Sequence, residues 1–202
     1  MTVDEIAGQL SLPRTTIYTW IRDIPLDRQR NWSKGQRRGT LAMQAKFRRL
    51  REEAYAAGAA EYERLIHLPT FRDFVALYVA EGYKRNRNTL SFANSDTRMV
   101  ALATSWFSQL TTTRLRFWLQ YHADQDPDGL RAYWGDALRI DGTNIAIQRK
   151  SNSEQLAGRR WRSRYGALTV VVHDTLLRAR MQAWMDRLRE DWGLDSAFPS
   201  GV

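Results

Sequence analysis

The sequence contains no cysteine, which excludes disulfide bonds, zinc sites built on thiolates, and catalysis by a thiol. It has no apolar run near the roughly 18 residues that a membrane-spanning helix needs. Its N-terminus lacks a basic segment followed by an apolar stretch, so we expect no secretory signal and a cytoplasmic location. The three histidines, His67, His122 and His173, do not have the spacing of metal ligands. No Gly-rich phosphate loop and no paired Ser-His-Asp pattern is present.

Positive charge is what the sequence has in excess. Lys and Arg number 31 against 22 for Asp and Glu, which gives a net charge of +9 over 202 residues. A field of this sign attracts polyanions. Most of the charge is arginine, whose planar fork suits bidentate contacts with phosphate and guanine. We therefore expect a nucleic-acid partner. A generally arginine-rich composition is the alternative explanation.

Two short helices are predicted at the N-terminus. Val3 to Leu10 has two acidic residues in its first turn, and the segment at Ser11 to Pro13 ends it. A second helix is expected from Arg14 to about Ile24. Its apolar residues fall on one stripe at helical spacing; they are Ile17, Trp20, Ile21 and Ile24. Its other side chains are basic or short and polar, and we expect them to contact DNA; they are Arg14, Thr15, Thr16, Tyr18, Thr19 and Arg22.

The pattern from Glu5 to Trp20 resembles the helix-turn-helix of resolvases, transposases and many repressors. The resemblance implies that the second helix lies in the DNA major groove and the first supports it. Ser11 stands where the turn usually has glycine. A helix that normally precedes the pair has no counterpart here, so either the start of the chain is misassigned or a later helix completes the core. A plain helical hairpin is the alternative.

A basic segment follows. Residues 28 to 51 contain nine basic residues and no acidic one. The part up to about Gly39 is expected to be flexible or turning, and Thr40 to about Ile66 to be helical. We expect this segment to follow phosphates through side chains such as Arg37 and Arg38, although a solvated arm is the alternative.

Strands and helices alternate in the remainder of the chain. Strands are expected at 89–93, 114–122, near 145–147 and at 165–173, and helices at 97–110, 127–138 and after Asp174, which begin at Asp96, Asp126 and Asp174. One face of the strand at 114–122 carries Arg114, Arg116, Trp118, Gln120 and His122. The strand near 145–147 carries Gln148 and Lys150 on its polar face, and the loop at 149–164 is basic. The DNA-contacting residues expected from this part are Arg114, Arg116, Trp118, Gln120, Gln148, Lys150, Arg159 and Arg160.

Residues 74 to 82 read FVALYVAEG, an apolar helix that runs into Glu81 and Gly82. This run resembles the signature of the LAGLIDADG homing-endonuclease family, which ends in Ala-Asp-Gly or Ala-Glu-Gly. Ala76 stands where that family usually has glycine. A glycine after the last helical residue is also common in helices of other families. The resemblance covers roughly residues 70 to 190 and implies an αββαββα domain whose saddle-shaped antiparallel sheet lies on duplex DNA.

The expected fold is therefore α+β with four parts. They are a helix-turn-helix (1–27), a basic and largely helical connector (28–69), a LAGLIDADG-like domain (70–192) and a tail (193–202).

Two functions follow from the resemblances. A regulator would bind double-stranded DNA sequence-specifically with both parts and would need no cofactor. A nuclease would hold Mg²⁺ through Glu81, the only catalytic or metal residue that the motif carries over, and would need a homodimer formed through the helix at 70–82. The family's lysine corresponds to Lys150 or Lys84, and no local motif decides between them. Glu81 also has a simpler role available, an ion pair with Lys84 or Arg85. A separate helix-turn-helix favours the regulator.

Overall fold

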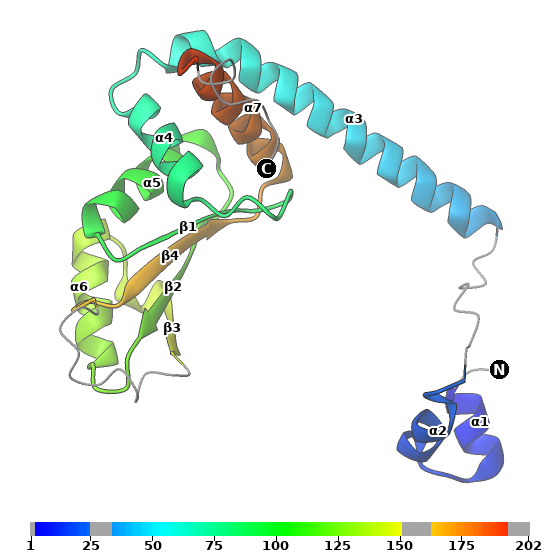
Figure 1. The fold of residues 1–202 in the computed structure, drawn as a ribbon. Helices are drawn as coiled ribbons and strands as arrows, with labels where there is room; N and C mark the ends of the chain where they lie inside the picture. Colours follow the sequence, from blue (N-terminus) through cyan, green and yellow to red (C-terminus); the bar gives the residue numbers. More distant parts are fainter. Residues whose placement is uncertain (1–2, 25–33, 151–162, 194–202) are drawn as a thin grey trace. The chain divides into compact units, whose positions relative to one another are not determined.

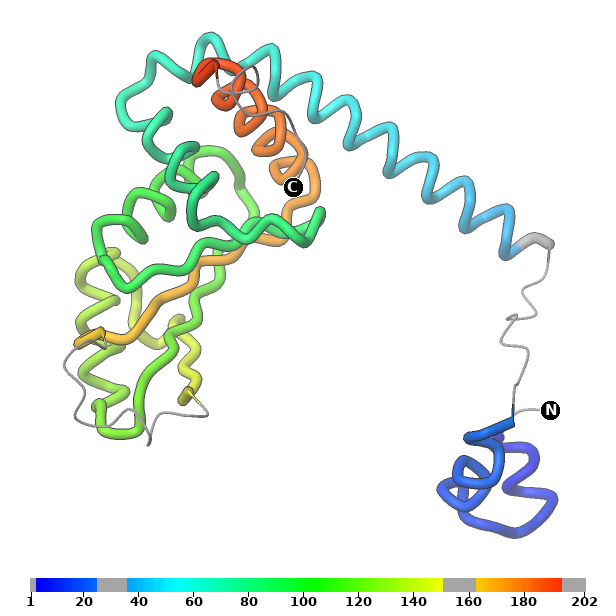
Figure 2. Tube along the Cα trace, viewed as in Figure 1, coloured from blue at the N-terminus to red at the C-terminus, as the bar shows by residue number. Residues whose placement is uncertain are grey.

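The computed structural model describes residues 3–24, 34–150 and 163–193. Within these ranges the chain is α+β, with seven α-helices and a mixed sheet of four strands (Figures 1 and 2). It divides into two compact units, Met1–Gln44 and Ala45–Val202. In these same ranges, no helix combines the length and the apolar character needed to cross a membrane.

The elements have the following bounds. The helices are α1 (Val3–Leu10), α2 (Arg14–Ile21), α3 (Lys34–Leu65), α4 (Phe71–Glu81), α5 (Thr97–Leu110), α6 (Pro127–Leu138) and α7 (Thr175–Asp191), and a short 3-10 helix, η1, spans Gly142–Asn144. The strands are β1 (Leu90–Asn94), β2 (Arg116–Tyr121), β3 (Ile145–Arg149) and β4 (Ala167–Val172).

Aspartates begin three of these helices, as the sequence predicts. The side chain of Asp96 accepts a hydrogen bond from the backbone N–H of Arg98, at 2.8 Å. Asp126 caps α6 and Asp174 caps α7 through the same kind of contact with two backbone N–H groups each. Each cap satisfies donors that have no partner inside the helix, which fixes where the helix starts.

Two helix boundaries differ from the prediction. Helix α2 ends at Ile21 rather than near Ile24. Helix α3 begins at Lys34 rather than near Thr40, so the expected turning stretch before Gly39 is wrong for residues 34–39. Two glycines in that stretch each cost about 1 kcal/mol relative to alanine, and the strong helix formers around them offset this cost.

The sheet is mixed, and the expected antiparallel sheet is wrong in one strand. The strand order is β1-β4-β2-β3. Strand β4 pairs antiparallel with both β1 and β2, whereas β2 and β3 are parallel. Helix α6 lies between β2 and β3 in the chain, and a crossover of that length returns the chain to the same end of the sheet and so makes a parallel pair.

The strand that an αββαββα order would place before β1 is reduced to a bridge. Gly82 pairs with Phe92 of β1, and the backbone N–H of Tyr83 donates to the carbonyl of Ser91 at 2.8 Å. Through these two contacts the segment after α4 lies beside β1 without forming a full strand. Helix α5 then follows β1 directly.

The core of the second unit lies between one face of the sheet and the helices. Helices α4 and α5 pack on β1, α5 also packs on β4, and α6 packs on β3. Phe92, Leu168 and Val170 point into this layer and are almost fully buried. The rings of Phe71, Phe74 and Trp106 form a cluster with one tilted, one edge-on and one stacked contact, with centroids 5.1 to 6.4 Å apart. Such packing holds α4 and α5 at a fixed position over the sheet.

The second half of α3 belongs to this core through α7. Tyr62 and Leu65 are buried in the same cluster. A Cβ on Gly58 would lie only 2.8 Å from the Cα of Arg180, so the helices touch backbone to backbone there. The indole N–H of Trp184 donates to the carbonyl of Gly58 at 2.9 Å. Residues 58–65 of α3 therefore belong to the core of the second unit, because they complete the packing around α7.

Candidate nucleic-acid interface

Helix α2 presents its polar side chains to solvent. Ile17 is buried, Thr16 is half-buried, and five expected contact residues are exposed; they are Arg14, Thr15, Tyr18, Thr19 and Arg22. The Arg14 guanidinium pairs with Asp4 of α1 at 3.2 Å and lies over the Tyr18 ring at 5.9 Å. Thr19 donates to the carbonyl of Thr15 at 3.0 Å. Thr15 and Tyr18 thus keep their side-chain oxygens available to a ligand.

The apolar stripe of α2 is only partly buried. Ile17 is 1% exposed, but Trp20 is 59% exposed and Ile24 is 52% exposed. The stripe is therefore buried at Ile17 and exposed at these two residues. Two short helices cannot enclose four large side chains, because each helix covers only one side of the other.

The turn between α1 and α2 takes a left-handed conformation at Ser11, with φ of 52°. This is the position where the resembling helix-turn-helix proteins usually carry glycine. The backbone N–H of Leu12 still donates to the carbonyl of Ala7 at 3.1 Å, which ends α1 and directs the chain into α2. Serine makes the turn at the steric cost that a Cβ carries in this region.

The two connector arginines lie on α3. Arg37 and Arg38 are both exposed. Arg159 and Arg160, expected in the basic loop, lie outside the described residues.

The sheet face opposite the helices brings the other predicted residues together. On β2, Arg116 and Gln120 are exposed and Trp118 is half-buried, while Phe117 and Leu119 point into the core. The register places Gln120 opposite Gln148 of β3. These side chains come from neighbouring strands and therefore share one surface. We call the surface made by Arg114, Arg116, Trp118, Gln120, Gln148 and Lys150 the polar sheet face.

Small side chains surround the tryptophan at the centre of the polar sheet face. Trp118 lies opposite Thr169 of β4 and Ala146 of β3. Arg114 donates from Nη2 to the Asn144 side-chain oxygen at 3.1 Å, which fixes one guanidinium at the rim. A groove of about 390 Å³ runs beside them and is lined by Arg114, Arg116, Trp118, Asn144 and Ala146 among others. Thr169 and Ala146 were not predicted as site residues, although the alternation of β4 places Thr169 on this face.

Lys150 and His122 directly follow the last residues of β3 and β2. The backbone N–H of Lys150 donates to the carbonyl of Tyr121 at 2.9 Å, so Lys150 continues the ladder of β3. His122 is 4% exposed. The expectation that it joins the polar face of its strand is wrong, because β2 ends at Tyr121 and the alternation of side chains ends there too.

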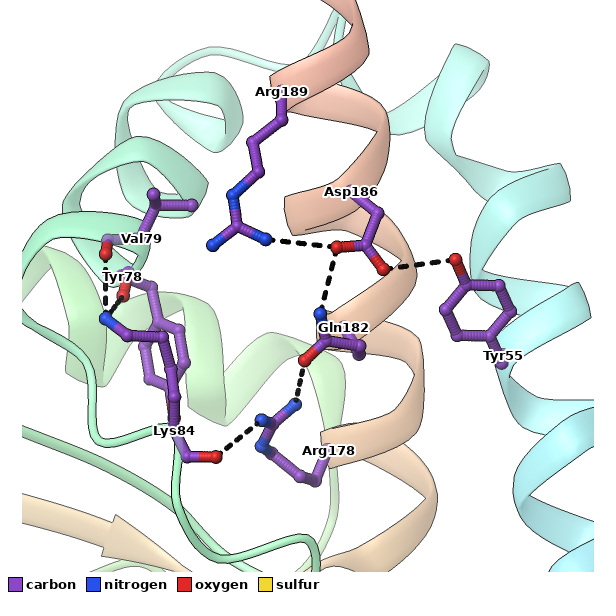
Figure 3. Close-up of polar contacts among 8 residues, drawn as sticks. All are labelled: Tyr55, Tyr78, Val79, Lys84, Arg178, Gln182, Asp186 and Arg189. Atoms are coloured by element: carbon purple, nitrogen blue, oxygen red, sulfur yellow. Dashed lines mark hydrogen bonds and ion pairs between the residues drawn. The ribbon is translucent and has the colours of Figure 1, made fainter. Parts of the chain in front are cut away.

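Glu81 is the last residue of α4 and is exposed. No hydrogen bond or ion pair joins its side chain to the described part of the chain. The alternative ion pair with Lys84 or Arg85 is absent from the described residues, and the Lys84 ammonium instead donates to the carbonyls of Val79 and Tyr78 at 2.7 and 3.5 Å (Figure 3). A lysine is favourable there because the unpaired carbonyls and the helix dipole make a helix C-terminus negative.

The described residues of one chain contain no cluster of side chains that could hold a divalent metal ion. Among the described residues, no three His, Asp or Glu side chains converge. Mg²⁺ takes several oxygen ligands in octahedral geometry, and Glu81 is the one metal ligand that the motif carries over. A second copy of α4 would have to supply the rest.

Gly82 follows with an ordinary extended backbone, φ −68° and ψ 145°. Its lack of a side chain is required for another reason. A Cβ at this position would lie 2.5 Å from the carbonyl oxygen of Tyr78 and 2.6 Å from its ring. The Tyr78 hydroxyl in turn donates to the carbonyl of Tyr83 at 3.0 Å, so the turn after α4 wraps closely around this ring.

Comparison with known proteins finds no matching family model, no matching curated protein and no matching solved structure.

Proposed function

We propose that the protein binds double-stranded DNA sequence-specifically and acts as a transcriptional regulator, with α2 in the major groove and the polar sheet face on the duplex. No cofactor is needed for this binding. The observation that carries the proposal is the alignment of Arg116, Trp118 and Gln120 on β2 with Gln148 on β3, on the sheet face away from the helices. Arginine and glutamine are the side chains that read guanine and adenine edges bidentately.

The connectivity of the second unit supports a LAGLIDADG-like reading of this surface. The Gly82 bridge and β1 form one antiparallel pair, and β2 and β4 form another. Helix α4 precedes the first pair, α5 separates the two and α7 follows them. With α6 and β3 taken as an insertion inside the second pair, this order is αββαββα. That family places its open sheet face on DNA.

A second copy of the chain, packed through α4, is part of the proposal. Helix α4 carries two small residues four apart, Ala76 and Ala80; Ala80 is exposed, and Ala76 is half-buried against the core. Small side chains at that spacing let two helices approach closely. A symmetric dimer would present two polar sheet faces to the two halves of a palindromic site.

Selection from a random duplex library, followed by fluorescence anisotropy on the selected sequence, tests the proposal. Arg116→Gln with Gln120→Ala should weaken binding to the selected site by about 1–3 kcal/mol per lost base contact. The matched control is Arg98→Gln with Gln109→Ala, the same residue types exposed on α5 in the helical layer. Equal weakening by both pairs, or selection that enriches no sequence, would overturn the proposal.

A further inference from the structure

A pocket of about 500 Å³ lies within the second unit, away from the polar sheet face. Three segments form it: residues 48–55 of α3, the start of α7, and the segment that follows α4. Its polar lining comes from Arg48, Arg51, Glu52, Arg87, Arg178, Tyr55 and Gln182. Four guanidinium groups from three separate segments therefore converge on one cavity.

Arg178 is the buried member of this set, at 6% exposure. One of its terminal nitrogens donates to the side-chain oxygen of Gln182 at 3.1 Å, and the other donates to the carbonyl of Lys84 at 3.1 Å (Figure 3). Both acceptors are neutral. Its Nε is buried without an acceptor, and no carboxylate of the described chain forms an ion pair with it. A buried charge without a counter-charge is strongly unfavourable, and a bound anion would relieve that cost.

The carboxylates near the pocket are already engaged. Asp186 accepts hydrogen bonds from Gln182 at 2.9 Å and from the Tyr55 hydroxyl at 3.1 Å, and it pairs with Arg189 at 3.1 Å (Figure 3). Asp186 thereby holds Gln182 and Tyr55 in position at the wall of the pocket. The carboxylate that lines the pocket itself is Glu52, which is exposed. Four arginines against one glutamate leave three positive charges unbalanced at the site.

This lining selects a class of ligand. Guanidinium groups match phosphate oxygens through paired N–H donors, and an excess of several positive charges favours a dianion over a singly charged carboxylate. The Tyr55 ring, the methyl group of Ala179 and the arginine stems supply an apolar wall. The volume lies within the range of roughly 300–1,000 Å³ that small-molecule sites occupy.

We propose that this pocket binds a phosphate monoester that carries a flat or apolar body, of about the size of a mononucleotide. Arg178 and Gln182 form its floor, Arg51 and Arg87 close on the phosphate from opposite segments, and Tyr55 contacts the body. The site stands independently of DNA binding. The same phosphate chemistry is found in the backbone of DNA, so the test must separate a free monoester from a phosphodiester.

Isothermal titration calorimetry on the full chain, with phenyl phosphate and adenosine 5′-monophosphate as ligands and adenosine as the uncharged control, measures this binding. Both monoesters should bind, and adenosine should not. Arg51→Gln with Arg87→Gln should weaken monoester binding at least tenfold. Arg72→Gln with Arg98→Gln removes two exposed arginines outside the pocket and should leave the affinity within twofold. Arg178→Lys keeps the charge but loses the fork, and should weaken binding while thermal unfolding confirms that the variant is folded.

Three outcomes would overturn the proposal. The first is no heat from either monoester at millimolar concentration. The second is equal weakening by the pocket pair and the control pair, which would mean that only the net charge matters. The third is that the pocket pair weakens duplex DNA binding more than tenfold relative to the control pair while no monoester binds, which would assign the pocket to the DNA backbone. Monoester binding by a chain that binds no DNA would sink the regulator proposal and leave this one intact.

Discussion

Gly82 is required because Tyr78 occupies the space that its side chain would need. An alanine there would place a Cβ 2.5 Å from the Tyr78 carbonyl oxygen, while its backbone angles suit any residue. The glycine of this motif is therefore explained by close packing against a buried ring, and not by a left-handed turn. The sequence alone suggests the left-handed turn, since glycine after a helix most often has that role.

Gly82→Ala should destabilise the second unit by about 1–3 kcal/mol, the usual cost of forcing extra atoms into a packed site. Urea unfolding followed by tryptophan fluorescence measures the change. Gly39→Ala, at a helical position where a Cβ meets nothing within 4 Å, is the control and should be neutral or stabilising by up to about 1 kcal/mol. Equal stability of Gly82→Ala and the wild type would show that the Tyr78 ring moves aside freely.

The regulator and nuclease hypotheses predict different effects of a substitution at Glu81. We expect the wild type not to cut plasmid DNA in the presence of Mg²⁺. We also expect Glu81→Gln to bind DNA as well as the wild type or better, because the change removes an exposed negative charge close to where phosphates would lie. Agarose-gel assays of supercoiled and linear plasmid, with binding measured in parallel, check both statements. Mg²⁺-dependent double-strand cuts that disappear in Glu81→Gln would establish the nuclease instead.

Helix α3 is joined to α7 by a buried phenol. The Tyr62 hydroxyl donates to Asp191 at 2.6 Å, and the ring is 2% exposed. Burial in the first place, and then the hydrogen bond to Asp191, raise the pKa of Tyr62 above its ordinary value of 10.0. The folded state therefore binds this proton more tightly than the unfolded state does. The resulting stability is fully present below pH 10 and is lost as the pH rises toward the folded-state pKa.

Tyr62→Phe should cost about 1 kcal/mol at pH 7, the net value of one hydrogen bond. Above pH 10 the difference should shrink, because the wild type must keep its phenol protonated in order to stay folded and the variant has none. Urea unfolding at pH 7, 9 and 10.5 measures the difference. Tyr83→Phe, which removes the hydroxyl of an exposed ring, is the control for the loss of one phenol. A difference between Tyr62→Phe and wild type that grows with pH would refute the linkage.

Helix α2 is expected to determine which DNA sequence is bound. Thr15→Ala with Thr16→Ala should relax the sequence preference, with each lost base contact costing about 1–3 kcal/mol on the selected site and little on other sequences. Competition anisotropy with selected and scrambled duplexes measures the ratio. The structure leaves Thr15 exposed and Thr16 half-buried, so the single change Thr15→Ala should account for most of the effect. An unchanged ratio would assign all sequence reading to the polar sheet face.

Local sequence patterns predicted the helices and strands well, but they did not predict which strands pair with one another. The alternation in β2 separates Phe117 and Leu119 from Arg116 and Gln120, and Asp126 and Asp174 are recognisable caps; all are confirmed. The same alternation cannot tell which strand lies beside β3, or in which direction, and there the prediction was wrong. Direction depends on the crossover through α6, which no single strand encodes.

The sequence also did not predict which side chains beside or within the apolar stripe of a helix are buried. Arg178 follows Leu177 on α7, and its burial depends on the carbonyl of Lys84, 94 residues away in the chain. Trp20 and Ile24 show the opposite case, since an apolar residue is buried only where another element covers it. The sequence therefore identified most of the polar sheet face, because Arg116, Trp118, Gln120 and Gln148 lie on strands whose side chains alternate between the two faces. It missed the arginine pocket, which is assembled from three segments.

On the scale of the whole chain, positive charge is spread over both units. Arg14 lies on α2 and Arg22 directly after it, Arg37 and Arg38 lie on α3, and Arg114 and Arg116 lie beside or on β2; all six are exposed. Charges distributed in this way would attract DNA before any base is read, since phosphate contacts position a protein and base contacts specify its site. Affinity at low salt should therefore depend on the number of arginines that reach phosphates.

Duplex DNA affinity should fall steeply with salt. Each phosphate that the protein neutralises contributes about −0.9 to the slope of log affinity against log salt concentration, so contacts by most of these six arginines predict a slope of about −4 to −5. Arg37→Gln with Arg38→Gln should make the slope shallower by about 2 and weaken all sequences alike. Thr15→Ala with Thr16→Ala should change sequence preference and leave the slope unaltered. Anisotropy titrations from 50 to 300 mM KCl measure all three slopes. A nearly flat wild-type slope, or a slope that the arginine pair does not change, would mean that these charges do not meet DNA.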